Sequence, residues 1–576
     1  MSLQPENDSI LVLDGEEFST LSIVRSLGRK GLTITVAATD DKAICRYSKY
    51  TQHFFTYPDP LTATEGFTQT IIKKLTEQNY TLLIPVTELT TLPLAKIRQQ
   101  IEQRTLLALA DNQALDIVTN KAKTFALAEK HGIPIPKSYH IDDLQALENC
   151  ITEINYPVVI KPSRSIADQK NDIRAKLKVD YAFNAEELQQ KTHNLLKYTE
   201  IILQEYFAGT GTGIELIADR GTIIHAFQHQ RLHELPLTGG GSCLRQSVAV
   251  HPQLLNYAQA LIKALNWHGV AMVEFKHNAE NNQSCLMEIN GRFWGSLPLA
   301  VAAGSDFPWF LYQMLIHQQY PQQFNSEPGH ISRKIKEDLY WYIQVIFRRD
   351  NSPLIKWPTT TQLIKDFCSI FNYRHHFDAF YYKDLKPGFI ELGRTGLWLY
   401  YFISGYIRKR WLKKKHLKIK QTQAIAQPLK LAKNIRFLCY GNINRSAVAE
   451  CLYHQRDNKR FSVQSAGFHP KNQRPADPNM VKIAQEYHCD MSNWSSLSLT
   501  ENMLNTADLI FVMEIEHIEK LTQQYPKQSR KTYLLSALDA DEKSPLEISD
   551  PYGKTLDEYR RCFNQIKNFI SQLNKL

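Results

Sequence analysis

Apolar runs and segments of helical spacing alternate along the first part of the chain. Short apolar runs lie at 9–15 and 33–38, and residues 19–31 between them have helical spacing and end in glycine. Residues 81–88 repeat the pattern of an apolar strand with a polar tip. This alternation predicts a parallel, doubly wound α/β sheet over residues 1–115. No GxGxxG follows the first strand, so the dinucleotide-binding fingerprint is absent.

The pattern changes to α+β over residues 116–325. A helix is predicted to end at Gly132, and a glycine-rich loop lies within "RLHELPLTGGGS". The runs at 270–278 and 284–290 predict two adjacent strands whose acidic residues converge.

Two further segments complete the chain. Residues 326–433 are aromatic and basic with little periodicity, so we expect a helical extension and linker there. Residues 434–576 predict a last α/β unit of common domain size.

The composition indicates a soluble protein of several domains. A chain of 576 residues is too long for one core, and its 43% hydrophobic and 22% charged residues are ordinary for globular proteins. No signal-peptide pattern opens the chain. Nine cysteines without CxxC pairs predict free thiols in a reducing compartment and no zinc site. We therefore expect a cytoplasmic protein.

The positive charge is concentrated in one segment. The net charge is +10, and residues 408–420 hold eight Lys or Arg and no acid, so nucleic-acid binding by the whole surface is not implied. The apolar-aromatic run before this segment is shorter than the ~20 residues that span a bilayer. Two alternatives remain: a peripheral contact with the inner face of the membrane, or a solvated basic face on a helix that packs between two enzymes.

The second segment carries residues suited to a nucleotide site. Glycines at 209, 211 and 213 permit close approach of backbone to a ligand. Two cations and three hard oxygen ligands of the kind that magnesium prefers lie on or beside its predicted elements. Each alone would be an ordinary surface residue. They are Lys121, Lys161, Glu274, Glu288 and Asn290.

The order of these motifs is more specific than any one of them. Lysine before "GIPIP", then "PVVIKP", "QEY", a glycine-rich stretch, "EF" and "EINGR" together resemble the ATP-grasp superfamily over about residues 1–325. The resemblance implies a pre-ATP-grasp domain followed by two lobes that clamp ATP. It also implies the following roles: Lys121 and Lys161 on the phosphates, Gln204 and Glu205 at the adenine hinge, and Glu274, Glu288 and Asn290 as ligands of Mg²⁺.

The resemblance further implies ligation of a small-molecule carboxylate and an amine. The carboxylate would attack the γ-phosphate of ATP, and the amine would displace phosphate from the acyl phosphate. Arg292 would stabilise the transferring group or bind the carboxylate. Arg231 heads a loop similar to the substrate loop of carboxylate–amine ligases, although an ion pair with Glu234 is the alternative. The superfamily also contains carboxylases and kinases, so ligase is its default activity.

The stretch "CYGNINRS" predicts a nucleophilic thiol. A cysteine is nucleophilic as thiolate, which backbone N–H groups and a helix N-terminus favour while they cradle a phosphate. Arg445 can bind two phosphate oxygens, and Ser446 can donate a hydrogen bond to the sulfur of Cys439. The loop between them forms the expected phosphate cradle: Tyr440, Gly441, Asn442, Ile443 and Asn444.

This stretch, with "SAGF", "ADP", "LIFVME" and "SDPYG", resembles the low-molecular-weight protein tyrosine phosphatases over 434–576. The resemblance implies Asp550 as general acid, no cofactor, and a phosphotyrosine protein as substrate, such as a tyrosine kinase of polysaccharide export. Two departures stand out. Trp494 occupies the family's histidine position, and Asn444 stands where relatives commonly carry a second cysteine that traps the oxidised nucleophile as a disulfide.

We therefore predict a bifunctional enzyme, a ligase fused to a phosphatase. In one alternative the front domain binds nucleotide without turnover and regulates the phosphatase. In another the rear domain reduces arsenate, for which Cys451, Cys489 and Cys562 would have to supply the further thiols.

Overall fold

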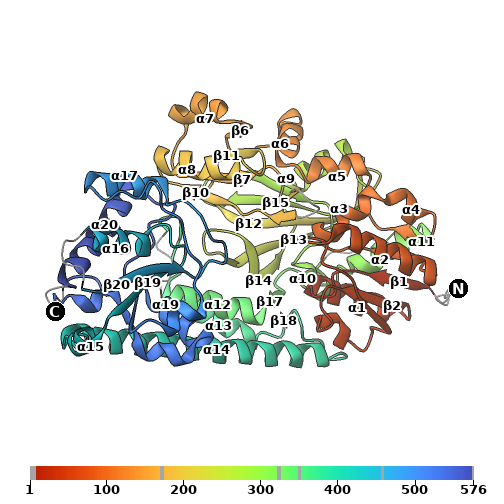
Figure 1. Ribbon diagram of the computed structural model, residues 1–576. Helices are drawn as coiled ribbons and strands as arrows, with labels where there is room; N and C mark the ends of the chain where they lie inside the picture. Colours follow the sequence, from red (N-terminus) through yellow and green to blue (C-terminus); the bar gives the residue numbers. More distant parts are fainter. Residues whose placement is uncertain are drawn as a thin grey trace. The chain divides into compact units, whose positions relative to one another are not determined.

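The computed structural model consists of two compact units, a front unit of residues 1–396 and a rear unit of residues 397–576 (Figure 1). The structure describes residues 8–168, 174–320, 326–347, 352–455, 460–541 and 543–573.

The front unit begins with the predicted parallel sheet. Its five strands have the order β3-β2-β1-β4-β5, and every pairing is parallel. Apolar residues of the central strands are buried on both faces, which is why these runs are continuous in the sequence. The strands are β1 Ser9–Val12, β2 Thr33–Ala38, β3 His53–Thr56, β4 Leu82–Ile84 and β5 Leu106–Leu107, and the helices that follow include α1 Phe18–Gly28, α2 Thr64–Glu77 and α3 Glu88–Lys96.

A small antiparallel sheet comes next, in the order β10-β7-β11-β6. Helices α7 (Leu144–Cys150) and α8 (Ala185–Leu195) pack on it around a separate apolar core (Figure 1). Its strands are β6 Ser138–Ile141, β7 Val158–Pro162, β10 Asp180–Ala182 and β11 Ile201–Glu205.

The largest sheet has seven strands in the order β16-β15-β12-β13-β14-β17-β18. Helix α9 (Pro252–Ala264) buries its apolar side against the long central strands. The strands are β12 Thr210–Asp219, β13 Thr222–Leu235, β14 Gly241–Val248, β15 Gly269–Asn278, β16 Gln283–Asn290, β17 Ile331–Arg333 and β18 His375–Phe377.

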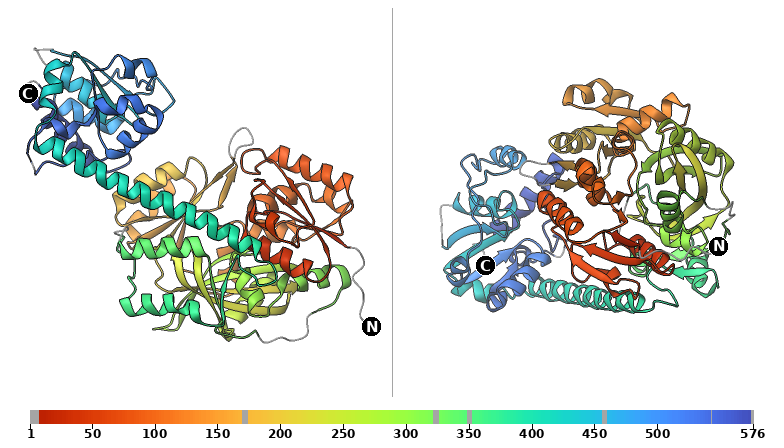
Figure 2. Two further views of the ribbon diagram at one scale, coloured as in Figure 1. Left: turned by 90° about the horizontal axis from the view of Figure 1, so that it is seen from below. Right: turned by 90° about the vertical axis from the view of Figure 1, so that its right-hand side faces the viewer.

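The segment 326–433, expected to be helical, also contributes two strands to this sheet. Strand β17 pairs with β14, and β18 pairs with β17. Helices α12 (Ile335–Ile346) and α13 (Thr360–Cys368) follow β17, and Figure 2 shows α14 (Lys386–Gln421) as one continuous helix. The expected boundary at residue 325 lies outside the described residues.

The rear unit contains the predicted parallel sheet, in the order β20-β19-β21-β22. Helices cover both faces and enclose one apolar core on each side. The strands are β19 Asn434–Cys439, β20 Ser462–Gly467, β21 Leu509–Val512 and β22 Thr532–Leu534, and the helices include α16 Arg445–His454, α17 Pro478–Glu486, α19 Ile515–Gln524 and α20 Leu556–Gln572. Within the described ranges, no helix is both long enough and apolar enough to cross a membrane.

Candidate functional site

A cavity of about 380 Å³ lies over one face of the seven-stranded sheet. The strand register places Glu288 opposite Glu274, Glu274 opposite Gly213, and Gly213 opposite His229. Directly paired residues point to the same face, so this row faces the cavity together. The next row on that face consists of Lys276, Gly211 and Arg231. Period-two alternation therefore gathers the charged side chains on one surface.

Two glycines create the space above the sheet. A Cβ atom at Gly213 would lie 2.7 Å from Cε1 of His229, and one at Gly211 would lie 2.8 Å from Cδ of Arg231. Neither position has room for a side chain unless its neighbour moves. The glycines thus let the side chains of adjacent strands lean across β12.

Both predicted phosphate-binding lysines line this cavity. Lys121 begins α6 (Lys121–Lys130), and its Nζ donates to Oγ of Ser165 at 3.2 Å. Nζ of Lys161 donates to Oε1 of Gln204 at 2.6 Å. Burial, together with the nearby charge of Lys121, lowers the pKa of Lys161 to about 8. Glu205 lines the same wall.

The three predicted metal ligands differ in whether a cationic side chain already pairs with them. Oε1 of Glu288 accepts from the amide of Asn290 at 3.0 Å, whereas Oε2 of Glu274 lies 2.5 Å from Nη2 of Arg231. Burial opposes ionisation of Glu288, but Lys121 and the other nearby cations lower the pKa of Glu288 below its ordinary value. An ionised carboxylate beside an amide oxygen fits Mg²⁺, while Glu274 is engaged by Arg231. The part of the chain that the structure describes contains no cluster of three or more His, Cys, Asp or Glu suited to a metal.

The two predicted arginines lie at the edge of the same cavity. Nη1 of Arg231 is 3.1 Å from Glu234, which is the ion pair considered as an alternative, in addition to its contact with Glu274. Nη2 of Arg292 is 3.6 Å from Oε1 of Glu88, at the start of α3. A residue of the first domain therefore contacts Arg292, which the sequence did not predict. Six cationic and four acidic side chains line the cavity, a balance suited to a polyphosphate.

Two further polar residues were not predicted: His229, which lines this cavity, and Glu215, which is buried beside it. Both continue the alternation that places Gly211, Gly213 and Arg231 on one face. A period-two count along "GTGIE" and "HQR" would have found them.

In the rear unit, Cys439 ends β19 and its loop runs directly into α16. Sγ of Cys439 lies 3.0 Å from Oγ of Ser446 and accepts from the backbone N–H of Asn442 at 3.2 Å. Asn442 has a φ of 54°, in the left-handed region that asparagine tolerates better than most residues. Its side-chain amide donates to Ser446 at 3.0 Å and to Ser465 at 2.7 Å. The loop is therefore held closed around the sulfur.

Arg445 connects this loop with the predicted general acid. Its Nη2 donates to Asp550 at 2.6 Å, and its Nη1 donates to Glu514 at 2.6 Å. Burial disfavours the charged guanidinium, but Cys439, Asp550 and Glu514 together raise the pKa of Arg445 above its ordinary value. Glu514, the last residue of "LIFVME", was not predicted as a site residue, and its contact positions the guanidinium.

The departure at position 494 also has a structural role. Nε1 of Trp494 donates to the backbone carbonyl of Asn442 at 2.8 Å. The backbone N–H of Leu497 donates to the side-chain carbonyl of Asn442 at 2.8 Å. The tryptophan therefore braces the phosphate loop from outside. By contrast, the buried Oδ1 of Asn444 has no hydrogen-bond partner among the residues that the structure describes.

Comparison with known proteins identifies the rear unit. Residues 434–576 match the family model of low molecular weight phosphotyrosine protein phosphatase. The low molecular weight protein-tyrosine-phosphatase Wzb of Escherichia coli (strain K12) is 30% identical over 139 residues, which are 24% of this chain and 91% of that protein.

Through its rear unit, the chain belongs to the low molecular weight phosphotyrosine protein phosphatase family.

The phosphatase domain has a second curated relative of comparable similarity, the protein-arginine-phosphatase of Bacillus subtilis (strain 168). It is 28% identical over 145 residues, 25% of this chain and 95% of that protein.

The front unit contains an ATP-grasp domain. Residues 197–337 match the family model described as ATP-grasp in the biosynthetic pathway with Ter operon. N5-carboxyaminoimidazole synthetase from Staphylococcus aureus has 14% sequence identity and a TM-score of 0.47, over 61% of this chain and 89% of that chain. The two family models show that the chain joins an ATP-grasp domain to a phosphatase domain, as predicted.

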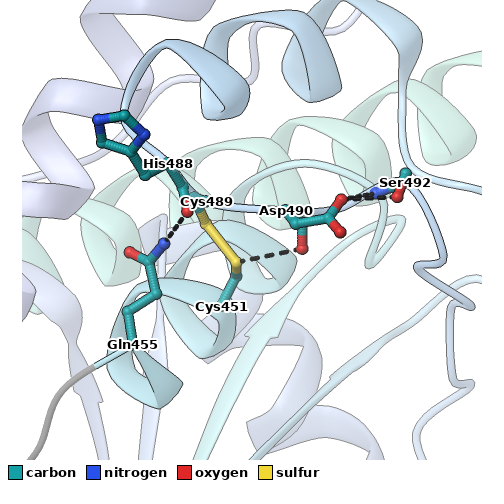
Figure 3. Close-up of a disulfide and its surroundings, with 6 residues drawn as sticks. All are labelled: Cys451, Gln455, His488, Cys489, Asp490 and Ser492. Atoms are coloured by element: carbon teal, nitrogen blue, oxygen red, sulfur yellow. Dashed lines mark hydrogen bonds between the residues drawn. A yellow bond between two sulfur atoms is a disulfide. The ribbon is translucent and has the colours of Figure 1, made fainter.

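The expectation that all cysteines are free thiols is wrong for two residues of the phosphatase domain. Cys451 on α16 and Cys489 form a disulfide (Figure 3). The two cysteines are 38 residues apart in the sequence, so their spacing did not reveal the pair. The other seven cysteines, Cys439 included, are free.

Proposed function

We propose that the chain is a bifunctional enzyme, an ATP-dependent carboxylate–amine ligase and a protein tyrosine phosphatase. The arrangement of Lys161, Glu288 and Asn290 in one cationic cavity supports the ligase activity. The contacts of Cys439 and Arg445 support the phosphatase activity. The domains we assign are a pre-ATP-grasp domain at 1–115, the ATP-grasp domain at 116–325, an extension at 326–433 and the phosphatase domain at 434–576.

In the ligase, the chain binds MgATP and holds a carboxylate near the γ-phosphate. Lys121 and Lys161 neutralise the phosphates, and Gln204 and Glu205 lie where adenine would bind. Glu288 and Asn290 would hold Mg²⁺, with Glu274 joining them when its ion pair with Arg231 opens. Bound Mg²⁺ supplies charge neutralisation of the phosphates. Arg292 and Arg231 bind the carboxylate and the transferring phosphoryl group.

The acyl phosphate is the step to test. If the carboxylate attacks the γ-phosphate, one of its oxygens leaves in inorganic phosphate when the amine displaces it. We expect heavy oxygen from a labelled carboxylate to appear in phosphate, measured by mass spectrometry. Transfer of label should vanish in Glu288→Ala. Ligation without any transfer of label would contradict the acyl-phosphate route.

In the phosphatase, Cys439 attacks the phosphorus atom and the leaving oxygen departs. The loop N–H groups and Arg445 hold the three phosphoryl oxygens, and Ser446 stabilises the sulfur when water later releases the phosphate. Asp550 donates a proton to the leaving oxygen and then activates that water. Arg445 exchanges its contact with Asp550 for the phosphate. This releases the carboxyl for proton transfer.

Leaving-group dependence tests the role of Asp550. Asp550→Asn should slow hydrolysis of phenyl phosphates with basic leaving groups by about 10²–10⁴-fold and affect acidic phenols much less. An equal loss for all phenols would contradict a general acid. Cys439→Ser should form no phosphoenzyme.

The proposed protein substrate is a tyrosine-phosphorylated protein, such as a tyrosine kinase of polysaccharide export. Curated relatives of the domain are named as protein-tyrosine-phosphatases, which supports this class. Arsenate reduction is the weaker alternative, because it needs further thiols to take up the oxidising equivalent, and Cys451 and Cys489 can supply thiols only after their disulfide is reduced.

We also propose that the protein is cytoplasmic and makes a peripheral contact with anionic lipid through α14. Many apolar residues of this helix are exposed, six of them at helical spacing, and exposed cations follow at its second half. The apolar residues are Phe389, Leu392, Tyr400, Ile403, Ile407 and Trp411, and the cations include Lys409, Arg410 and Lys414.

Vesicle co-sedimentation tests this contact. We expect binding to vesicles that contain anionic phospholipid and little binding to neutral vesicles, since each basic residue near the surface contributes about 1 kcal/mol. Lys409→Gln with Lys414→Gln should weaken binding by roughly tenfold or more. Binding that is indifferent to anionic lipid would instead support the solvated basic face.

A further inference from the structure

A buried polar triplet, two members of which line the ATP-grasp cavity, has no role in the ligase described above. Glu215 is fully buried, and His229 is 1% exposed. Nδ1 of His229 lies 2.8 Å from Oε1 of Glu215, outside the angular range of a hydrogen bond. Oγ of Ser296 donates to the same Oε1 at 2.5 Å. Both His229 and Ser296 line the cavity.

The position of His229 ties this triplet to the reacting groups. On the sheet face, His229 and Glu274 occupy the same row, and only Gly213 lies between them. Because a Cβ atom at Gly213 would lie 2.7 Å from Cε1 of His229, the glycine lets the imidazole ring occupy the space above β12, beside the cavity that His229 lines. The histidine is thus a neighbour of the proposed metal ligands without being one of them.

The carboxylates that line the cavity all have other partners. Glu205 accepts from Asn155 and Glu288 accepts from Asn290. Glu234 and Glu274 both pair with Arg231. Because carboxylates engaged in this way are poor proton acceptors, they leave the imidazole as the base best placed in the cavity.

We propose that His229 is the general base that deprotonates the amine substrate, and that Glu215 is its positioning residue. The inference rests on the proposed ligase. An amine of ordinary basicity is an ammonium ion at neutral pH and has no lone pair for attack. The imidazole takes one proton from it, and the free amine forms the C–N bond. The C–O bond to phosphate breaks with its electron pair on phosphate, and the departing phosphate takes the second proton that the nitrogen loses when it becomes an amide. Glu215 stabilises the imidazolium, and Ser296 holds Glu215.

The substrate class follows from this chemistry. The second substrate is a protonated alkyl amine, not an amine that is already neutral at pH 7. Hydroxylamine is mostly unprotonated at neutral pH and traps acyl phosphates as hydroxamates, so it does not need the base. Comparing the reactions of the alkyl amine and hydroxylamine therefore distinguishes an effect on formation of the acyl phosphate from an effect on deprotonation of the amine.

The experiment uses the full chain with MgATP and a pool of the twenty common amino acids as both carboxylate and amine, with and without hydroxylamine. ADP release and hydroxamate are measured for wild type and His229→Asn. We expect His229→Asn to lose amine-dependent ADP release by about 10²–10⁴-fold while hydroxamate formation stays within a few fold. Glu215→Gln should show the same selective loss in weaker form.

His225→Asn is the matched control. His225 is a buried histidine of the same strand that contacts Ser305 and does not line the cavity. The His225→Asn variant should have the same ratio of amine-dependent turnover to hydroxylamine-dependent turnover as wild type. An equal loss of both reactions in His229→Asn, or no loss of either, would overturn the role of His229. No ADP release by wild type with either nucleophile would instead overturn the ligase.

Discussion

At the scale of single residues, Lys161 has a charge that depends on its ligand. Burial lowers the pKa of Lys161 to about 8, with Lys121 as the second cause. A bound triphosphate places negative charge beside this ammonium group and raises the pKa again. Binding of MgATP should therefore take up a proton near pH 8.

This pKa determines how the affinity for MgATP depends on pH. Below pH 8 Lys161 is already charged in the free protein, so the affinity for MgATP is constant. Above pH 8 the free lysine is neutral, and affinity for MgATP should fall by up to about tenfold per pH unit. Isothermal titration calorimetry at several pH values checks this. Lys161→Arg, which stays charged, should remove the decline, and an unchanged decline in that variant would assign it to another group.

A matched pair of asparagines tests the phosphate loop. The side chain of Asn442 makes three hydrogen bonds and its backbone is in the left-handed region, whereas Oδ1 of Asn444 has no partner. Asn442→Ala should lower the free energy of unfolding of the phosphatase domain by about 2–4 kcal/mol and abolish most activity. Asn444→Ala should cost less than about 1 kcal/mol. Denaturant unfolding measures both, and equal effects would contradict the bracing role of Asn442.

The sequence predicts the role of a residue when that role depends on residues nearby in the sequence. Cys439, Arg445 and Ser446 share one loop, so their spacing alone indicated the cradle. Trp494 acts across 52 residues on a backbone carbonyl, and no spacing rule reveals such a contact. Glu514 is also far from Arg445 in the sequence, so spacing does not reveal their contact.

At the scale of elements, the phosphate loop and α16 limit the redox chemistry of the phosphatase. Asn444 cannot form a disulfide with an oxidised Cys439, and Cys451 is bonded to Cys489 (Figure 3). Peroxide should therefore inactivate the enzyme through Cys439, with little recovery on addition of thiol.

Asn444→Cys is the gain-of-function variant for this prediction. It should recover much of its aryl phosphatase activity after peroxide and thiol, with modest change in turnover before oxidation. Full recovery of the unmodified enzyme after prolonged peroxide would mean that another thiol reaches Cys439. Cys451→Ser then tests whether that thiol is Cys451.

The elements that the sequence predicted well are those whose burial is uniform or strictly periodic. The parallel strands of both α/β sheets read as continuous apolar runs because helices cover both faces. Strands β17 and β18 are only three residues each and join a sheet built mainly from residues far earlier in the chain. Tertiary pairing defines these strands, so 326–433 was predicted as a helical extension and linker. Helix α14 shows little periodicity in its sequence because apolar and charged residues are both exposed along it.

At the scale of the whole molecule, each unit contains the side chains that we propose for its own chemistry. The front cavity is lined by residues between 121 and 334, and the phosphate loop contacts lie between 439 and 550. No side chain has to serve both sites. The two activities should therefore be separable by single substitutions in the intact chain.

The most direct test measures both turnover rates on the same preparations of wild type, Glu288→Ala and Cys439→Ser. We predict that Glu288→Ala loses MgATP-dependent ADP release and keeps hydrolysis of aryl phosphates. Cys439→Ser should lose hydrolysis and keep ADP release. An aryl phosphatase activity that survives Cys439→Ser, or an ADP release that survives Glu288→Ala, would contradict the assignment of two separate active sites.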